Sequence, residues 1–325
     1  MVTEEMNGRL VCAVDLGGTH LRAATIDANG KIWVRWKQNT PITDKPQEIV
    51  EAIVGAVRQC DEQRAGEGRS SGMISVVVPG TVNIAAGKVT RIPNVPCLDS
   101  FELAAALGDA LGRPVILEND ANAAAVGEMW LGAASGYRTI VCLTLGTGVG
   151  SGIILDGKLW HGANDSAGEI GHTSLEPFTG VACSCGSRGC LEVYASATAI
   201  VRMTREELPH YPASDLNAKN DLTARDVFAA GKNGDALAIE VFQRMGDYLG
   251  VGLANVINVL NPEMIVIGGG VANGWKLFEK PMHQRIKEYA FRLPAADVRI
   301  VPAERGDDAG LLGAARLVFL RAEVR

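Results

Sequence analysis

Residues 9–27 read RLVCAVDLGGTHLRAATID, and residues 139–160 read TIVCLTLGTGVGSGIILDGKLW. Both stretches predict the same order of elements, which is a buried strand, a glycine-rich turn and a second strand. A third strand is expected after each, over residues 31–37 behind the Asn29–Gly30 turn and at the end of the second stretch. Two such openings in one chain predict two similar folding units.

The rest of the chain alternates between helices and strands. Helices are predicted over residues 46–64 and 101–112, strands over 73–78 and 114–119, and an alanine-rich helix from Asp120. Helical segments are expected between about residues 191 and 260, followed by a strand over 263–270, a helix, a strand over 297–302 and a helix after Asp308. This alternation predicts an α/β protein with mixed sheets covered on both faces.

The composition is that of an ordinary globular protein. The chain has 325 residues, of which 47% are hydrophobic and 21% charged, enough for a large core and two domains. The net charge of -6 argues against nucleic acid as a partner. The acidic N-terminus does not resemble a signal peptide, and polar residues and a proline interrupt the most apolar stretch, residues 249–272. A cytoplasmic location, without membrane contact, is expected.

The two glycine turns are the first candidate binding sites. In one interpretation, glycine amides approach a phosphate, Thr19 adds a hydroxyl donor and Asp15 holds a hydrated Mg²⁺. In the other, the first turn is a tight hairpin capped by Asp15. Neither turn fits a P-loop or a Rossmann fingerprint. Because the turns occupy equivalent points of two similar units, together they suit a triphosphate held from both sides.

Two further strand ends carry candidate residues. Asn119 and Asp120 stand where a strand meets a helix, and Asp120 is either a general base for a hydroxyl proton or, like Asn119, a helix cap. Residues 268–271, GGGV, follow a buried strand and serve either close approach to a ligand or helix–strand packing.

A cysteine-rich loop, GEIGHTSLEPFTGVACSCGSRGCLE over residues 168–192, is the third candidate site. Its potential metal ligands are His172, Cys183, Cys185 and Cys190. This Cys₃His set suits tetrahedral Zn²⁺, and four protein ligands leave no position for a reactive water, so a structural ion is expected. Glu169 and Glu192 flank the loop, either as hydrogen-bond acceptors for a polyhydroxylated ligand or as surface glutamates.

These pieces, in this order, resemble the ROK family (repressors, open reading frames and kinases), especially its bacterial glucokinases. The resemblance runs from VDLGGTHLRAATID through PGTVN, IPNVP, ENDANAAAVGE, residues 143–172, CSCGSRGCLE and GGGV to DDAGLLGAA. It implies the actin-like sugar-kinase fold, with two α/β domains hinged over a cleft. The expected smaller domain is 1–118, with helix 308–325 packed back on it, and the larger is 119–307.

The resemblance also implies phosphoryl transfer from ATP to a hexose, most simply to the 6-hydroxyl of glucose, with Asp120 as catalytic base. It implies sugar binding by Gly80, Asn94, Asn119, Asp120, Glu169, His172 and Glu192. It places Asp15, Gly17, Gly18, Thr19, Gly146, Thr147 and Gly148 around the phosphates and Mg²⁺, with Gly269 and Gly270 on the adenosine side. His172 is similar to the family histidine that binds zinc and also touches the sugar.

Two departures leave alternatives open. His20 follows GGT where the family commonly has Lys or Asn, and NVPCLDS replaces the commoner Asn-Leu/Val-Pro-Gly-Trp. Fructose, mannose, allose and N-acetylmannosamine therefore stand beside glucose as candidate sugars. A sugar-sensing repressor is a second expectation, opposed by the early first strand, which leaves no room for a helix-turn-helix, and by the acidic charge. A third is a zinc-stabilised nucleotide-binding protein. A homodimer is common in the family.

Overall fold

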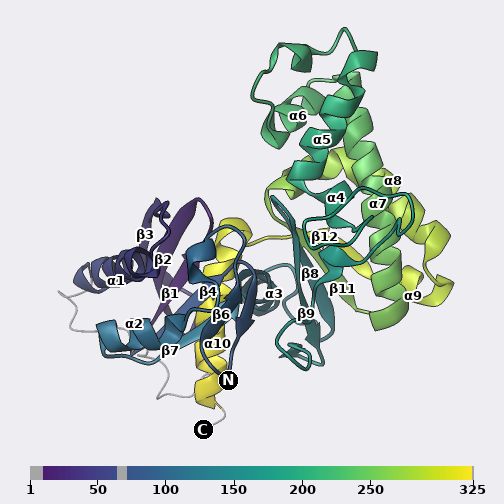
Figure 1. The fold of residues 1–325 in the computed structure, drawn as a ribbon. Helices are drawn as coiled ribbons and strands as arrows, with labels where there is room; N and C mark the ends of the chain where they lie inside the picture. The colour runs from purple at the N-terminus through teal and green to yellow at the C-terminus, as the bar shows by residue number, and fades with distance from the viewer. Residues whose placement is uncertain (1–9, 64–71, 324–325) are drawn as a thin grey trace. The chain divides into compact units, whose positions relative to one another are not determined.

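The computed structural model describes residues 10–63 and 72–323 (Figure 1). These residues form two five-stranded sheets and a two-stranded one. Most predicted elements are confirmed, although the expected end of the first helix at residue 64 lies outside the described residues. Within them, no helix combines the length and the apolarity needed to cross a membrane.

Two compact units divide the described residues. Unit 1 takes them from Met1–Arg138, Gly152–Ala167 and Glu304–Arg325, and unit 2 takes them from Thr139–Ser151 and Gly168–Ala303. The predicted domain boundary lies after residue 118, whereas unit 1 continues through Arg138. The physical reason is that helix α3 (Asp120–Leu131) packs against helix α10 (Ala309–Glu323).

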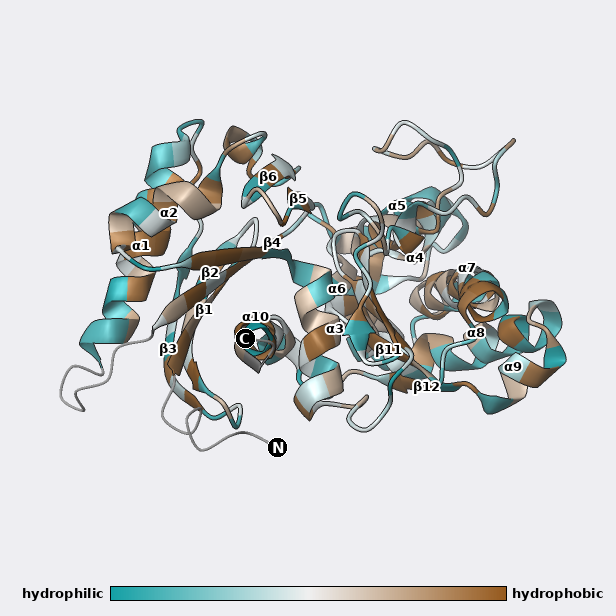
Figure 2. Ribbon diagram, turned by 90° about the horizontal axis from the view of Figure 1, so that it is seen from below, coloured by the Kyte–Doolittle hydropathy of each residue, from teal (hydrophilic) through white to brown (hydrophobic). Residues whose placement is uncertain are grey.

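Unit 1 is built on the first sheet, in the order β3-β2-β1-β4-β7. Strands β1 (Leu10–Leu16), β2 (His20–Asp27) and β3 (Ile32–Asn39) are antiparallel neighbours, whereas β4 (Met73–Val78) and β7 (Val115–Asn119) run parallel to β1. Helices α1 (Pro46–Glu62) and α2 (Leu103–Leu111) lie on one face (Figure 2). Strands β5 (Thr81–Asn83) and β6 (Lys88–Arg91) form a separate hairpin that the sequence did not predict.

The last helix of the chain completes the core of unit 1. Its buried face, including Leu312 and Phe319, packs against Val11 and Val77 of the sheet, and Figure 2 shows α10 on the face opposite to α1. Close contact with α3 depends on glycine, because a Cβ at Gly313 would lie 1.7 Å from the carbonyl oxygen of Ala123. Burial of this apolar face fixes the helix on the sheet.

Unit 2 contains three parallel strands of the second sheet, β8 (Ile140–Leu145), β11 (Met264–Gly268) and the edge strand β12 (Arg299–Pro302). The full sheet order is β10-β9-β8-β11-β12, with β9 (Val149–Leu155) and β10 (Lys158–Leu159) antiparallel. Both sheets thus place their third, second, first, fourth and fifth strands side by side in the same order. The two similar openings therefore do start two sheets of the same connectivity.

The helices of unit 2 are α4 (Glu192–Ala195), α5 (Ala197–Glu207), α6 (Ala224–Lys232), α7 (Ala236–Leu260), α8 (Trp275–Tyr289) and α9 (Arg292–Asp297). The helix predicted from about residue 191 is observed as α4 and α5, and the helical region predicted after the polar stretch 209–221, up to about residue 260, is observed as α6 and α7. Polar caps explain the divisions, because the side chains of Ser196, Thr223 and Asp235 accept amides of the first turns of α5, α6 and α7.

Candidate active site

The first glycine turn is a hairpin whose tip is exposed. The amide of Gly17 donates to the carbonyl of His20 at 2.9 Å, and the hydroxyl of Thr40 donates to the carbonyl of Gly17 at 2.6 Å. Gly18 and Thr19 at the tip are exposed. A Cβ at Gly18 would lie 2.8 Å from Cβ of Asn94, so the predicted sugar-side residue lies directly against this turn.

Asp15 is a partly buried carboxylate at the end of β1. Its Oδ2 lies 3.7 Å from a guanidinium nitrogen of Arg22, which also approaches Asp307 at 3.4 Å. Burial raises the pKa of Asp15 to about 6, although Arg22 opposes the increase. The carboxylate of Asp15 thus faces the cation of Arg22 on the neighbouring strand, a contact that the capped-hairpin interpretation does not include. Arg22 was not among the residues predicted from sequence.

The end of β7 separates the two roles that the sequence left open for Asn119 and Asp120. Asn119 is the cap of α3, because its Oδ1 accepts the amide of Asn122 at 3.0 Å, and its Nδ2 donates to the carbonyl of Gly80 at 2.9 Å. Asp120 is the first residue of α3 and its Oδ1 accepts the amide of Ala121 at 2.8 Å. The cap is therefore supplied by Asn119, and Gly80 is held beside it.

Behind this turn lies a buried carboxylate that sequence reasoning missed. The side chain of Glu118 is 4% exposed and its Oε2 lies 2.8 Å from Nε2 of His161. Its Oε1 accepts the amide of Asn119 and the Nδ2 of Asn122, each at 3.0 Å. The ENDAN motif contains Glu118, but its partner His161 is 43 residues away in sequence, so spacing alone could not identify the pair.

The second glycine turn, at the end of β8, is held by helices α4 and α5. The amide of Gly146 donates to the carbonyl of Gly148 at 2.9 Å, and the hydroxyl of Thr198 donates to the carbonyl of Thr147 at 2.8 Å. Glu192 reaches the turn from α4, and its Oε2 accepts the amide of Val149 at 2.9 Å. The turn is therefore positioned by a carboxylate that follows the cysteine loop.

Three sequence motifs of unit 2 meet at Val149. Its amide binds Glu192, and its carbonyl would lie 2.2 Å from a Cβ at Gly171 in the GEIGH motif. In that motif, the carboxylate of Glu169 is half exposed and lies 3.9 Å from Nε2 of His172. The other ring nitrogen, Nδ1, lies 3.6 Å from the sulfur of Cys183. The two nitrogens of His172 therefore face two different groups.

The four predicted metal ligands are close together. The ligand atoms of His172, Cys183, Cys185 and Cys190 all lie within 4.8 Å of one another. The sulfurs of Cys185 and Cys190 are 3.7 Å apart. Tetrahedral Zn²⁺ with bonds of about 2.3 Å to sulfur and about 2.1 Å to nitrogen requires ligand separations of roughly 3.5–3.8 Å. The donor set and its spacing fit such an ion.

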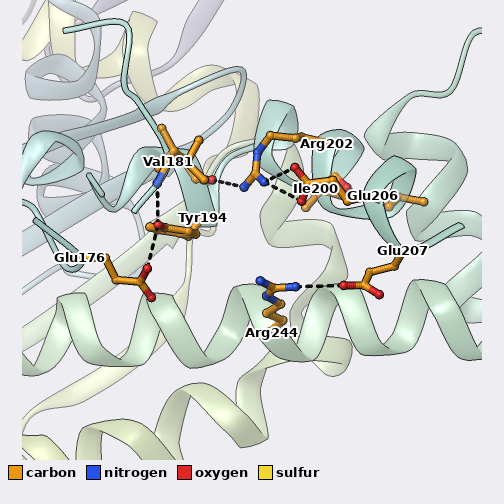
Figure 3. Close-up of polar contacts among 10 residues, drawn as sticks. Glu176, Val181, Tyr194, Ile200, Arg202, Glu206, Glu207 and Arg244 are labelled. Atoms are coloured by element: carbon orange, nitrogen blue, oxygen red, sulfur yellow. Dashed lines mark hydrogen bonds and ion pairs between the residues drawn. The ribbon is translucent and has the colours of Figure 1, made fainter. Parts of the chain in front are cut away.

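The loop treats two of its thiols differently and has a fixed shape. A backbone hydrogen bond from Ser187 lowers the pKa of Cys185, whereas burial raises the pKa of Cys190 to about 12, so its thiolate needs a cation beside it. Glu176 anchors the loop to the helices, accepting the hydroxyl of Tyr194 at 3.2 Å (Figure 3) and that of Tyr248 at 2.7 Å. The two tyrosine rings stack with centroids 3.9 Å apart.

An open pocket of about 620 Å³ adjoins the second glycine turn and helices α5 and α6. It is lined by Thr147, Ala197, Thr198, Val201, Arg202, Arg205, Glu206, Thr223 and Ala224. Arg202 is already engaged by Glu206 at 2.7 Å, as Figure 3 shows. The predicted Gly269, whose φ is +84°, packs against the backbone of Leu145, while Gly270 has open space around its Cα. Both glycines are exposed, but a side chain at Gly269 would collide with the backbone of Leu145, whereas one at Gly270 would meet open space.

Each unit therefore brings together part of the predicted site. Unit 1 groups Gly18 with Asn94 and Gly80 with Asn119, and unit 2 groups Gly148 with Glu192 and the metal ligands with Glu169.

Known proteins resemble the whole chain. A glucokinase from Halalkalibacterium halodurans is 39% identical over 320 residues, with 96% of each chain covered. A crystal structure of a ROK family glucokinase from Streptomyces griseus, in complex with glucose and AMPPNP, has a TM-score of 0.81 at 33% identity and covers 95% of this chain and 98% of that one. A crystal structure of a ROK family transcriptional regulator has a TM-score of 0.87 at 28% identity and covers 95% of this chain and 78% of that one.

These relatives share the α/β architecture described above, which is the actin-like fold of ROK sugar kinases. The sequence pattern of the ROK family matches residues 11–320, from β1 into α10. The chain belongs to the ROK family.

Proposed function

We propose that this protein is an ATP-dependent hexose kinase that transfers the γ-phosphoryl group of ATP to the 6-hydroxyl of glucose. The observation that carries the proposal is that Asn119 and Asp120 have different roles at the end of β7. Asn119 caps the helix, so the carboxylate of Asp120 is not needed as its cap. Glucokinases similar over nearly the whole chain support the sugar assignment.

In the proposed mechanism, Asp120 accepts the proton of the attacking hydroxyl while the phosphoryl group moves in line from ADP to the sugar oxygen. Asn119 and Gly80, which are hydrogen-bonded to each other, hold the sugar with Asn94, and Glu169, His172 and Glu192 contribute from unit 2. The amides of Gly17 and Gly146 bond carbonyls of their own turns, so the other amides of residues 17–19 and 146–148 would neutralise developing charge on the phosphoryl oxygens.

Mg²⁺ would supply charge neutralisation at the β- and γ-phosphates. Asp15 fits this role, because its pKa of about 6 leaves it ionised at neutral pH in a partly buried position that a cation would stabilise. The nucleoside end of ATP is assigned to the pocket beside Thr147, with Gly269 and Gly270 on its adenosine side.

The cysteine loop is proposed to hold a structural Zn²⁺ through His172, Cys183, Cys185 and Cys190. The metal would fix the segment between His172 and Cys190, whose ends carry Glu169 and Glu192. The ring of His172 then serves both sites, with Nδ1 toward the metal and Nε2 toward the sugar side.

ADP release from purified protein with MgATP, measured against a panel of hexoses and amino sugars, tests the proposal. Glucose is expected to stimulate release, and Asp120→Asn to lower the stimulated rate by about 10²–10⁴-fold, since general-base catalysis is typically of this size. The asparagine keeps the size and polarity of the side chain, so the thermal melting temperature should change little. If another sugar stimulates more strongly, the chemistry stands and the NVPCLDS segment becomes responsible for specificity.

The similarity to a ROK transcriptional regulator supports a second candidate, a sugar-sensing regulator. Sugar binding without any sugar-dependent ADP release, in protein that is folded and metal-bound, would favour this second function over the kinase. We further propose that the protein acts in the cytoplasm, in glycolysis, and as a homodimer. Sedimentation equilibrium tests the assembly state.

A further inference from the structure

Glu118 forms the centre of a buried hydrogen-bond network directly behind the proposed base. Its two carboxylate oxygens have three partners: the amide of Asn119, the side-chain amide of Asn122 and the imidazole of His161. A buried carboxylate without partners would be strongly destabilised, so each of these contacts constrains the others. Asp120 lies between two of the residues that Glu118 holds.

Asn122 depends on this carboxylate. It is 3% exposed, and in the described part of the chain its Oδ1 has no hydrogen-bond partner. Its side chain is therefore oriented through the single bond from Nδ2 to Glu118 at 3.0 Å. The backbone amide of the same residue bonds Asn119 at 3.0 Å. Movement of Glu118 would therefore disturb the first turn of α3 on both sides of Asp120, at Asn119 and at Asn122.

His161 connects this network to a loop of unit 1, residues 160–167. The carbonyl of His161 accepts the amide of Ala167 at 3.0 Å. Within the same loop, Asp165 accepts the amide of Ile84 at 3.0 Å, next to the β5–β6 hairpin that begins one residue after Gly80. The loop is therefore bonded both to the end of β7, through Glu118, and to the β5–β6 hairpin that follows Gly80, through Ile84.

We propose that His161 is a positioning residue for the phosphoryl transfer, which orients Asp120 by holding Glu118, and through it Asn119 and Asn122, in one geometry. The inference rests on the proposed kinase function and assigns a role to a histidine outside the catalytic and metal-binding sets. His161 touches no reacting atom in this scheme. Its effect on the rate arises because small displacements of a base from the reacting hydroxyl cost large factors in rate.

The charge state of His161 should therefore influence turnover. The hydrogen bond to Glu118 raises the pKa of His161 above its usual value near 6.5, with Asp165 adding to the increase and Arg321 of α10 opposing it. The charged pair is fully present below about pH 6.5 and is lost as the pH rises through the raised pKa. Above that pH a neutral ring with its proton on Nε2 still donates, so only part of the effect should disappear.

The test compares His161→Leu and His161→Gln with the matched control His210→Leu, which removes an exposed histidine that pairs with Glu207 at 3.3 Å. His161→Leu should lower kcat by about 10- to 100-fold with KM for MgATP changed less than about 2-fold. His161→Gln keeps a donor and should retain kcat within about 3-fold, but it should abolish the decline of kcat above pH 6.5. His210→Leu should leave kcat, KM for MgATP and the pH dependence of kcat unchanged.

Hydrogen exchange at the amides of residues 119–123 gives a second measurement that does not need turnover. His161→Leu should speed this exchange about 10-fold while exchange in unit 2 stays constant. Proton NMR of the five histidines should show the pKa of His161 falling in Glu118→Gln. Unchanged kcat and unchanged exchange in His161→Leu would overturn the inference, as would a lower melting temperature with kcat intact. Absence of sugar-dependent ADP release in the wild type would instead refute the kinase function, and exchange would still decide whether His161 holds the turn.

Discussion

The two glycine turns stand at equivalent points of two sheets with the same strand order, but they are built differently. The first is closed by Gly17 and His20 and is preceded by its own acid, Asp15, two residues before Gly17. The second is closed by Gly146 and Gly148, has no acidic residue, and receives a carboxylate from Glu192 instead. Each turn thus has a carboxylate beside it, which comes from strand β1 in unit 1 and from the end of the cysteine loop in unit 2.

Because of this difference, we expect the acid of the first turn to act in catalysis and the acid at the second turn to hold the backbone in place. Asp15 is partly buried, has a raised pKa and faces Arg22, a setting that suits a cation-binding role. Glu192 accepts the backbone amide of Val149 and lies two residues after Cys190, so its position depends on the loop that the proposed metal would hold. Perturbing the first turn should therefore affect catalysis without disturbing the cysteine loop, whereas perturbing the second should affect folding of that loop as well.

Among changes that compare the two turns, the largest effect is expected from Asp15→Asn. Loss of this charge should lower sugar-dependent turnover by about 10²–10³-fold, similar to the removal of other groups that stabilise transition-state charge. Because the folded pKa is raised to about 6, wild-type stability should fall as the pH rises from about 4 to about 6, and Asp15→Asn should lack this decline. Turnover is measured with MgATP, and stability is measured by urea unfolding across this pH range without Mg²⁺. A variant that retains full turnover would remove the asymmetry between the turns.

The next effect is expected from metal loss. Cys183→Ser should reduce bound zinc from about one equivalent to nearly none, lower the melting temperature and weaken sugar binding by roughly 10- to 100-fold. Elemental analysis, thermal melting and calorimetric sugar titration measure these changes. Cys97→Ser, a partly buried cysteine of unit 1 outside the cluster, is the control and should leave the zinc content unchanged. Tight sugar binding by zinc-free protein would show that the loop is held without metal.

The smallest effect compares two glycines of the second turn. A Cβ at Gly148 would lie 2.2 Å from Oε2 of Glu192, whereas a Cβ at Gly146 meets no atom within 4 Å. Gly148→Ala should displace the carboxylate and break its bond to Val149, which is worth about 1–3 kcal/mol of stability. Gly146→Ala should cost much less. Equal losses of stability and of turnover in the two variants would mean that Glu192 does not position the turn.

Sequence patterns predicted the elements better than their contacts. Buried apolar strands, the capped alanine-rich helix and the two glycine turns are local features, and the structure places them where expected. The Cys₃His cluster was also predictable, because its three cysteines lie within eight residues of one another. The site residues themselves remain predictions of role, although the structure groups several of them.

What sequence could not identify are contacts between distant segments. The pairs Glu118–His161 and Arg22–Asp307 join residues 43 and 285 positions apart, and no spacing rule connects them. The β5–β6 hairpin was missed because its strands are three and four residues long, too short for a period-two pattern.

The packing of α10 on the first sheet also sets the order in which the protein can be completed during synthesis. Strands β1 and β4 leave the ribosome early, but the helix that buries one of their faces comes more than 200 residues later. Until then, Val11, Ile26 and Val77 remain an uncovered apolar surface in a chain that is still growing. Unit 2, whose residues are all made before that helix, is therefore expected to reach its native packing first, and the N-terminal sheet would be the part most dependent on chaperones.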